Sequence, residues 1–186
     1  SDWPATNLDL GNLRLRQGRV AEAVAAYERA IRLDPRFAAA YINLADAWRQ
    51  QEREPEAEKL LRQGLAVMPR DAELHHALGL VLVRRHENDA ALGEFIEAAR
   101  LAPDNARYAY IQAIALHAAG KRTEALAVLR AANRRHPDDL DVLGALISIS
   151  REAGDRRAAL RYAQQAAGLL PDNVELKQLV AELDGR

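Results

Sequence analysis

The sequence predicts an all-α fold of stacked antiparallel helix pairs, because three columns of residues recur every 34 positions. The first column is proline, at Pro35, Pro69, Pro103, Pro137 and Pro171. The other two columns hold small residues, namely Ala23, Ala57, Ala91, Ala125 and Ala159, then Ala30, Gly64, Ala98, Ala132 and Ala166. A fixed period of this length is typical of a repeat protein, in which each unit buries its apolar face only against its neighbours.

The prolines divide the chain into repeats, and each repeat holds two predicted helices. The repeats are 4–37, 38–71, 72–105, 106–139 and 140–173, within a single domain that spans residues 1–186. In the second repeat, apolar residues from Tyr41 to Trp48 follow the i, i+3, i+4, i+7 spacing of an amphipathic helix. Pro55, whose fixed φ suits the first turn of a helix, begins the second helix, which ends before Pro69.

Turn and cap residues recur in the same phase. Gly18, Gly120 and Gly154 fall between the two helices of their repeats, where glycine can adopt the left-handed conformation after a helix end. Short polar side chains immediately precede the next predicted helix at four places and are predicted N-caps: Asp71, Asn105, Asp139 and Asn173. Residues 174–184 are predicted to form a last helix that caps the apolar face of the fifth repeat.

Residues 4–173 resemble the tetratricopeptide repeat (TPR) family. The resemblance rests on the terminal prolines, the alanine column and two more columns: Gly11, Ala45, Gly79 and Ala113, then Tyr27, Leu61, Phe95 and Leu129. It implies a right-handed α-solenoid whose concave surface is made by the first helix of each pair. The fifth repeat departs from the pattern, with Ile147 at the small position and Ala163 at the large one. Because overfilling a helix contact costs about 1–3 kcal/mol, we expect these two changes to exchange volume or to alter the helix angle slightly. The alternative is weak packing near this end of the chain.

The charge balance argues against binding to nucleic acid or to a membrane surface. The net charge is −1, from 26 basic and 27 acidic residues, and no long run of either sign occurs. Of the basic residues 23 are arginine. We attribute this excess to a genomic codon bias, which would also explain the abundant alanine, rather than to anion recognition. The longest apolar stretch, around Leu80 to Val83, is far too short to cross a bilayer.

The candidate binding site is the stripe of each first helix that the resemblance places on the concave face. Its residues are Asn12, Asn43, Asp46, Arg49, Glu73, His76, Leu80, Val83, Arg84, Arg107, Tyr110, Ile114 and His117. Leu80, Val83, Tyr110 and Ile114 form a predicted apolar middle with a polar rim, an arrangement that suits a peptide or a partner protein. Arg107 and Tyr110 are residue types common at binding hot spots. The alternative is that the apolar residues only complete the helix packing.

Known peptide-binding patterns of the family do not transfer. Asn12 and Asn43 match the two asparagines of the clamp that grips the C-terminal carboxylates of chaperones. The basic positions of that clamp are occupied by Leu8, Glu73 and Ala77, so carboxylate clamping is not expected. A ladder of asparagines along the inner face, which binds a peptide backbone in some members of the family, is interrupted here at most of its positions. Self-assembly into a homo-oligomer is the competing function, through an end face around Leu8, Leu13 and Leu15 joined by Trp3.

No catalytic, metal or cofactor site is predicted, and the chain is not expected to be an enzyme. Cysteine is absent, which removes thiolate chemistry and cysteine-based zinc sites. His76 and His117 lie about two turns apart on neighbouring first helices, too far for one tetrahedral site with bonds of about 2 Å. Glu73 and His76 share a helix face, but they lack a pocket and a third orienting group.

The compartment is open. The chain begins at Ser1 rather than methionine, so we expect it to be a piece of a longer protein that lacks its native N-terminus. A cytoplasmic location is favoured. The sequence of residues 98–109 also loosely resembles repeat arrays of some exported bacterial multihaem cytochrome-like proteins. A periplasmic location is therefore the alternative.

Overall fold

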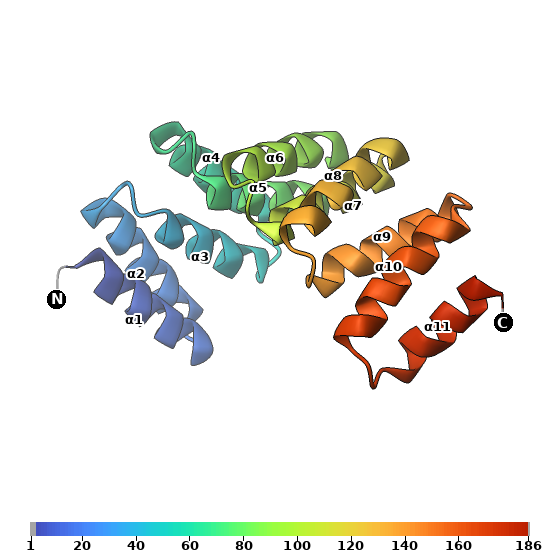
Figure 1. The fold of residues 1–186 in the computed structure, drawn as a ribbon. Coiled ribbons are helices and arrows are strands. Elements are labelled where there is room, and N and C mark those ends of the chain that lie inside the picture. Colours follow the sequence, from blue (N-terminus) through green and yellow to red (C-terminus); the bar gives the residue numbers. More distant parts are fainter. Residues whose placement is uncertain (1–2, 186) are drawn as a thin grey trace. The chain divides into compact units, whose positions relative to one another are not determined.

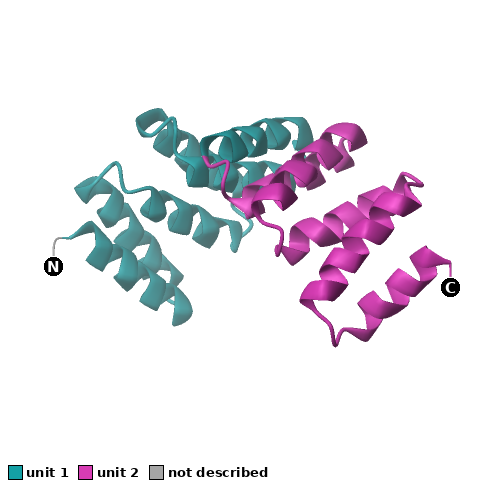
Figure 2. Cartoon of the chain, viewed as in Figure 1, with its two compact units in different colours: residues 1–101 teal, residues 102–186 magenta. Residues whose placement is uncertain are grey.

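The computed structural model describes residues 3–185, and these form eleven α-helices and no β-strand (Figure 1). In chain order the helices are α1 (Pro4–Arg16), α2 (Val20–Leu33), α3 (Ala38–Arg49), α4 (Glu54–Val67), α5 (Ala72–Arg84), α6 (Asn88–Leu101), α7 (Ala106–Ala118), α8 (Arg122–Arg135), α9 (Leu140–Glu152), α10 (Arg156–Leu169) and α11 (Val174–Asp184). The predicted all-α class of stacked helix pairs is confirmed. The helices fall into two compact units, residues 1–101 and 102–186, which are described separately (Figure 2). The single domain therefore stays a prediction.

Unit 1 holds three helix pairs, α1 with α2, α3 with α4 and α5 with α6, and each pair packs on the next. Aromatic rings fill the space left by two glycines of the predicted small column. A Cβ on Gly11 would lie within 2.9 Å of three Tyr27 ring atoms, and a Cβ on Gly79 within 3.0 Å of three Phe95 ring atoms. Both rings are buried. The first helix of these pairs approaches the ring so closely that no larger residue fits without a shift.

Unit 2 holds the pairs α7 with α8 and α9 with α10, followed by α11, which packs on α10. Ile147 on α9 and Ala163 on α10 are both buried, with 7% and 0% of their surface exposed. The fifth repeat thus buries its larger residue on the first helix and its smaller one on the second, and the expected exchange of volume stays a prediction.

The cap helix is observed over the predicted residues. Arg156 on α10 holds the C-terminal end of α11, because its Nε donates to the Leu183 carbonyl at 2.7 Å and its Nη2 to the Glu182 carbonyl at 2.8 Å. These bonds satisfy carbonyls that have no partner within the helix itself. Leu183 is buried, while Val174 at the start of the helix is 63% exposed.

The junction between the two helices of a repeat uses one left-handed residue. Gly18, Gly120 and Gly154 have φ of 73°, 77° and 73°, which confirms the three predicted turns. The same position in the second and third repeats holds Glu52 (φ 58°) and His86 (φ 62°), which are the positive-φ residues other than glycine among residues 3–185. The backbone plan is therefore the same in all five repeats, and two of them adopt it without glycine.

The predicted N-caps are confirmed at the starts of α5, α7, α9 and α11. Asp71 accepts from the Leu74 backbone N–H at 2.9 Å, and Asn105 accepts from that of Tyr108 at 3.3 Å. Asp139 and Asn173 make the same bond to the residue three positions on, each at 2.9 Å. Phe37 occupies this position before α3 and caps nothing with its side chain, so α3 lacks that bond.

Candidate functional site

The first helices of unit 1 form one continuous layer, since α3 contacts both α1 and α5. This layer carries the predicted site residues from Asn12 to Arg84. Most of them are half-buried, while Glu73, Val83 and Arg84 are exposed. We call the surface formed by Asn12, Asn43, Asp46, Leu80 and Val83 the first-helix face of unit 1.

A pair of amides joins α1 to α3 on this face. Asn43 Nδ2 donates to Asn12 Oδ1 at 2.8 Å, and the Tyr27 hydroxyl of α2 donates to the same oxygen at 2.8 Å. Burial is the main cause that raises the pKa of Tyr27, so its hydroxyl stays protonated and able to donate. The Asn12 Nδ2 and the Asn43 Oδ1 make no hydrogen bond to any residue that the structure describes. One donor and one acceptor are thus held in place without a hydrogen-bond partner among the described residues.

Asp46 and Arg49 form an ion pair one turn further along α3, with 3.0 Å between Arg49 Nη1 and Asp46 Oδ1. Burial raises the pKa of Asp46, and the Arg49 guanidinium opposes that rise. The two predicted charges therefore neutralise each other on the first-helix face.

The site residues of α5 differ in their surroundings. The His76 ring packs against Phe95, with 5.8 Å between ring centroids. Arg84 is tied to the start of α4, since its Nε donates to Glu54 Oε1 at 2.7 Å. Leu80 is half-buried and Val83 is 43% exposed, so these two give the face an apolar part at its α5 end.

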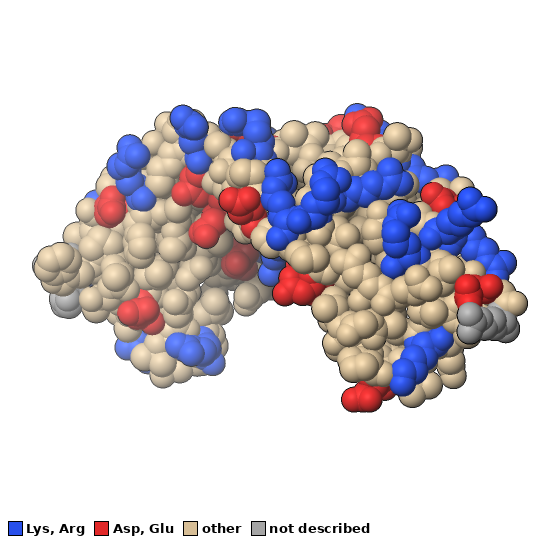
Figure 3. Space-filling view, in the orientation of Figure 1, with Lys and Arg blue, Asp and Glu red and all other residues tan. Residues whose placement is uncertain are grey.

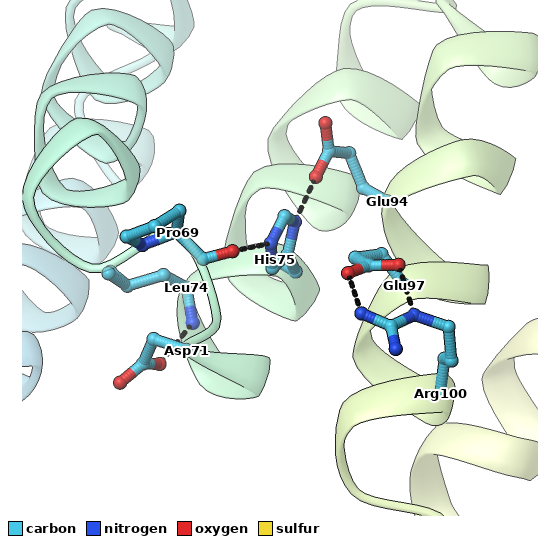
Figure 4. A network of polar contacts seen from close by, with 7 residues as sticks. All are labelled: Pro69, Asp71, Leu74, His75, Glu94, Glu97 and Arg100. Atoms are coloured by element: carbon cyan, nitrogen blue, oxygen red, sulfur yellow. Dashed lines mark hydrogen bonds and ion pairs between the residues drawn. The ribbon is translucent and has the colours of Figure 1, made fainter.

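His75, the neighbour of His76, serves the fold instead (Figure 4). Its Nδ1 lies 2.6 Å from Glu94 Oε2 on α6, and its Nε2 lies 3.1 Å from the Pro69 carbonyl oxygen in the turn before α5. Glu97 on α6 pairs with Arg100 beside this network, at 2.6 Å. His75 therefore joins the two helices of the third repeat to the preceding turn.

In unit 2 the predicted residues lie on α7. Arg107 is exposed, Tyr110 is half-buried and Ile114 is 39% exposed. His117 is held by Glu152 of the neighbouring α9, with 2.9 Å between His117 Nε2 and Glu152 Oε2. The expected apolar strip from Leu80 to Ile114 would run through both units and stays a prediction.

Sequence reasoning missed the partners of the site residues, namely Tyr27, Glu54 and Glu152. The period contains the signal that would have found one of them. Glu152 follows His117 by one repeat and one residue, which places it on the next first helix at nearly the same level. Tyr27 was assigned only to packing, although its hydroxyl reaches the face.

The part of the chain that the structure describes contains no group of three or more His, Asp or Glu side chains that could hold a metal ion. None of its helices is both long enough and apolar enough to cross a membrane. Neither finding adds a site to the first-helix face.

The N-terminal surface around α1 is partly apolar. Trp3 is 73% exposed, Leu10 is 40% exposed and Leu13 is 45% exposed, whereas Leu8 and Leu15 are half-buried. The predicted end face thus contains Leu13 and Trp3 as expected and is extended by Leu10. An open hollow of about 290 Å³ lies beside it, lined by Leu10 and by residues of α1 and α2.

Comparisons with known proteins agree with the repeat pattern. A family model described as tetratricopeptide repeat matches residues 8–72 and 76–139. The Cell division cycle protein 27 homolog of Caenorhabditis elegans is 35% identical over 95 residues, which cover 51% of this chain and only 12% of that protein.

Solved structures with the same fold cover nearly the whole chain. YrrB, a TPR protein with an unusual peptide-binding site, superposes with a TM-score of 0.70 at 22% identity, over 97% of this chain and 91% of YrrB. PilF of Pseudomonas aeruginosa gives a TM-score of 0.77 at 20% identity, over 98% and 83% of the two chains. MamA gives 0.72 at 18% identity, over 96% and 94%. At these identities the similarity concerns the fold alone.

Proposed function

Because the chain belongs to the tetratricopeptide repeat family, whose members are typically protein-binding scaffolds without catalytic activity, we propose that it is a binding module for a peptide segment of a partner protein. The segment lies along the first-helix face of unit 1. The proposed role is binding of this segment without catalysis.

The amide pair carries this proposal. An extended peptide presents alternating backbone N–H and C=O groups, each of which needs a partner when it is taken out of water. Asn12 Nδ2 offers a donor and Asn43 Oδ1 an acceptor, and both side chains are fixed by the shared oxygen and by Tyr27. Because the two amides are held before the peptide arrives, little further side-chain entropy is lost on binding.

The rest of the first-helix face offers the peptide a contact surface with little net charge. Leu80 and Val83 offer apolar surface to a side chain of the peptide. Asp46 is neutralised by Arg49, and Arg84 by Glu54. We therefore expect a ligand with apolar side chains and few charges. Arg107, Tyr110 and Ile114 of unit 2 extend the site if the peptide continues onto α7.

The experiment is a selection from a random peptide-display library on the whole chain, followed by titration of a selected peptide. Asn43→Ala is expected to weaken the selected peptide about tenfold, since one hydrogen bond in a partly buried site is worth about 1 kcal/mol or more. Val83→Asp should weaken it as well. Gln63→Ala, on the exposed side of α4, is the control and should leave affinity within about twofold. Equal binding to all three variants, or no selected peptide, contradicts the proposal.

Self-assembly through the α1 surface is the second candidate function. Trp3, Leu10 and Leu13 are each exposed, Leu10 also lines the hollow between α1 and α2, and exposed apolar patches mark interaction surfaces. A homo-oligomer predicts a mass above that of one chain by light scattering, and its loss in Leu10→Glu/Leu13→Glu. A monomer at all protein concentrations contradicts this function and leaves peptide binding unaffected.

A further inference from the structure

The second helices of the two units carry opposite charge. Helices α8 and α10 of unit 2 hold seven arginines and one acidic residue, Glu124. Helices α2, α4 and α6 of unit 1 hold five basic and eight acidic residues. The arginine excess is thus unevenly placed, although codon bias would act on both units alike. Figure 3 shows the basic side chains gathered over α8 and α10.

Four of these arginines form one surface, which we call the basic face. Arg130 and Arg134 stand four residues apart on α8, and Arg157 and Arg161 stand four residues apart on α10, so each pair shares one side of its helix. All four are exposed.

The two helices that carry the basic face lie side by side. Asn133 of α8 and Gln165 of α10 exchange hydrogen bonds of 3.3 and 3.1 Å between their amides, and Gln165 Nε2 also donates to the Pro137 carbonyl at 2.7 Å. Residues one repeat apart sit at the same level on the two helices. The four guanidinium groups are therefore carried by two helices that both pack on α9 and are joined by these amides.

The charges of the basic face are not neutralised within the protein. Among the described residues, none forms an ion pair or hydrogen bond with Arg130, Arg134 or Arg157. Arg161 lies over the Tyr162 ring, with 5.0 Å between the guanidinium carbon and the ring centroid, which leaves its charge uncompensated. Like charges four residues apart on a helix destabilise it, so the arrangement costs stability in the free protein.

The same repeat position is neutralised in unit 1. Arg62 stands two repeats before Arg130, and its Nε donates to Glu58 Oε1 at 2.8 Å. In α8 the residue equivalent to Glu58 is Leu126, which is half-buried and carries no charge.

A second position differs in the same way. Arg100 stands one repeat before Arg134, and it pairs with Glu97 at 2.6 Å. The residue equivalent to Glu97 is Ala131. Both acidic partners of unit 1 are thus replaced by apolar residues in unit 2.

We propose that the basic face of unit 2 is a second binding surface, for a short acidic segment of a partner protein. A guanidinium fork matches a carboxylate with two parallel hydrogen bonds, and the spacing of each arginine pair suits carboxylates about 5–6 Å apart. Thr123 and Gly168 lie on the same side of the helices, and their small size leaves room for a peptide backbone. This surface is separate from the first-helix face and does not depend on it.

Two other polyanions fit less well. Membrane-surface helices insert apolar side chains, but in the described part of α8 and α10 the exposed large apolar side chain is Leu169 alone, in the last turn of α10. Single-stranded nucleic acid needs aromatic rings for base stacking, and Tyr162 is buried. The carboxylates of a protein segment require neither feature.

The test is fluorescence anisotropy of a labelled dodecaglutamate peptide titrated with the whole chain, with dodecaglutamine as the neutral control. Saturable binding of dodecaglutamate alone is expected, weaker at about 0.15 M salt than at about 0.05 M.

The decisive variant is Ala127→Glu/Ala131→Glu, which gives unit 2 acidic partners without removing an arginine. Each new glutamate stands three residues before Arg130 or Arg134, the spacing at which Glu97 pairs with Arg100. Leu126 and Ala131 are both half-buried, but only Ala131 stands three residues before an arginine of the basic face, so Leu126 is left in place. The variant should weaken binding about tenfold. Ala127→Gln/Ala131→Gln adds side chains of the same size without charge, and it should stay within about threefold of the unchanged chain.

Arg62→Gln/Arg100→Gln is the matched control at the same repeat positions of unit 1, and it should stay within about twofold of the unchanged chain. Arg130→Gln/Arg134→Gln gives a second route to the loss if circular dichroism shows that the glutamate variant misfolds. An equal loss in the unit 1 control or in the glutamine variant overturns the proposal. So does equal binding of dodecaglutamine, or tighter binding of phosphatidylserine-containing vesicles or single-stranded DNA than of dodecaglutamate, which would assign the face to a membrane or to nucleic acid.

Discussion

The repeats of unit 1 and the fifth repeat, which lies in unit 2, are built on one 34-residue plan but fill the contact between paired helices differently. In unit 1, Gly11 and Gly79 receive the rings of Tyr27 and Phe95. In the fifth repeat, in unit 2, the first helix carries the bulk and the second helix an alanine. From this difference we expect that the repeat fixes the combined volume of a facing pair of residues and leaves open which helix supplies it.

The junctions differ as well. Both junctions of unit 2 use glycine at the left-handed position, whereas unit 1 uses Gly18 once and then Glu52 and His86. A left-handed backbone is strained for residues other than glycine, so unit 1 holds strain that unit 2 lacks.

The largest expected effect comes from the facing pair of the fifth repeat. Ile147→Ala should destabilise the protein by about 2–5 kcal/mol, because it leaves a cavity, and Ala163→Leu alone by about 1–3 kcal/mol, because it overfills the contact. The double variant restores the small-on-first, large-on-second arrangement of Ala113 and Leu129 in the repeat before it. Guanidinium unfolding should therefore show that the double variant recovers much of the loss. Simple additivity of the two single changes contradicts the exchange of volume.

Gly79→Ala addresses the opposite arrangement in unit 1. A Cβ there meets the Phe95 ring, so we expect a loss of about 1–3 kcal/mol in the free energy of unfolding. Gly93→Ala is the matched control on α6, where a Cβ would meet nothing within 4 Å. The control should gain about 0.5–1 kcal/mol, since alanine favours helix over glycine. If both variants lose stability, the close approach of α5 to the ring is not what the glycine serves.

His86→Gly should relieve the strain at the third junction and stabilise the protein by about 0.5–1 kcal/mol. Gly120→Ala is the reverse change at the same position of unit 2, and it should cost a similar amount or somewhat more. Thermal unfolding of the two variants measures both signs. A loss of stability in His86→Gly would mean that the His86 side chain contributes more than its backbone costs.

Much of the fold follows from the sequence because the same structural signals recur in five successive repeats. The alanine columns, the N-caps and the glycine turns each have a local physical cause that acts on single residues. The left-handed conformation of Glu52 and His86 was missed, because the left-handed turns were predicted only where glycine occurs and not from the position within the repeat. The phase alone would have placed them.

The candidate site was less predictable, because its properties belong to pairs of residues. Asn12 and Asn43 were selected one by one, but the shared oxygen that leaves a donor and an acceptor unused appears only when two helices are set side by side. The arginine excess was attributed to composition. Only the ion pairs made by Glu58 and Glu97 in unit 1 reveal that the equivalent arginines of unit 2 lack acidic partners.

The smallest expected effect concerns acid and again separates the units. The glutamates whose pKa is lowered, Glu54, Glu56 and Glu97, all lie in unit 1, and in each case a hydrogen bond from an arginine is the largest cause. A lowered pKa means that the unfolded chain binds the proton more readily. The stability from such a group is therefore complete above the ordinary glutamate pKa and is lost as pH falls through the lowered value.

Glu97→Gln isolates one such group. The advantage of the unchanged chain over Glu97→Gln in unfolding free energy should be constant at neutral pH and should vanish in acid, on the scale of a surface ion pair. In an Arg100→Gln background the same comparison should give no pH dependence, because the hydrogen bond that lowers the pKa of Glu97 is gone. Asp46 acts in the opposite sense, since burial raises its pKa and its protonation in acid removes a cost. Persistence of the pH dependence without Arg100 would place its origin in the neighbouring His75 or Arg70, which act on Glu97 more weakly.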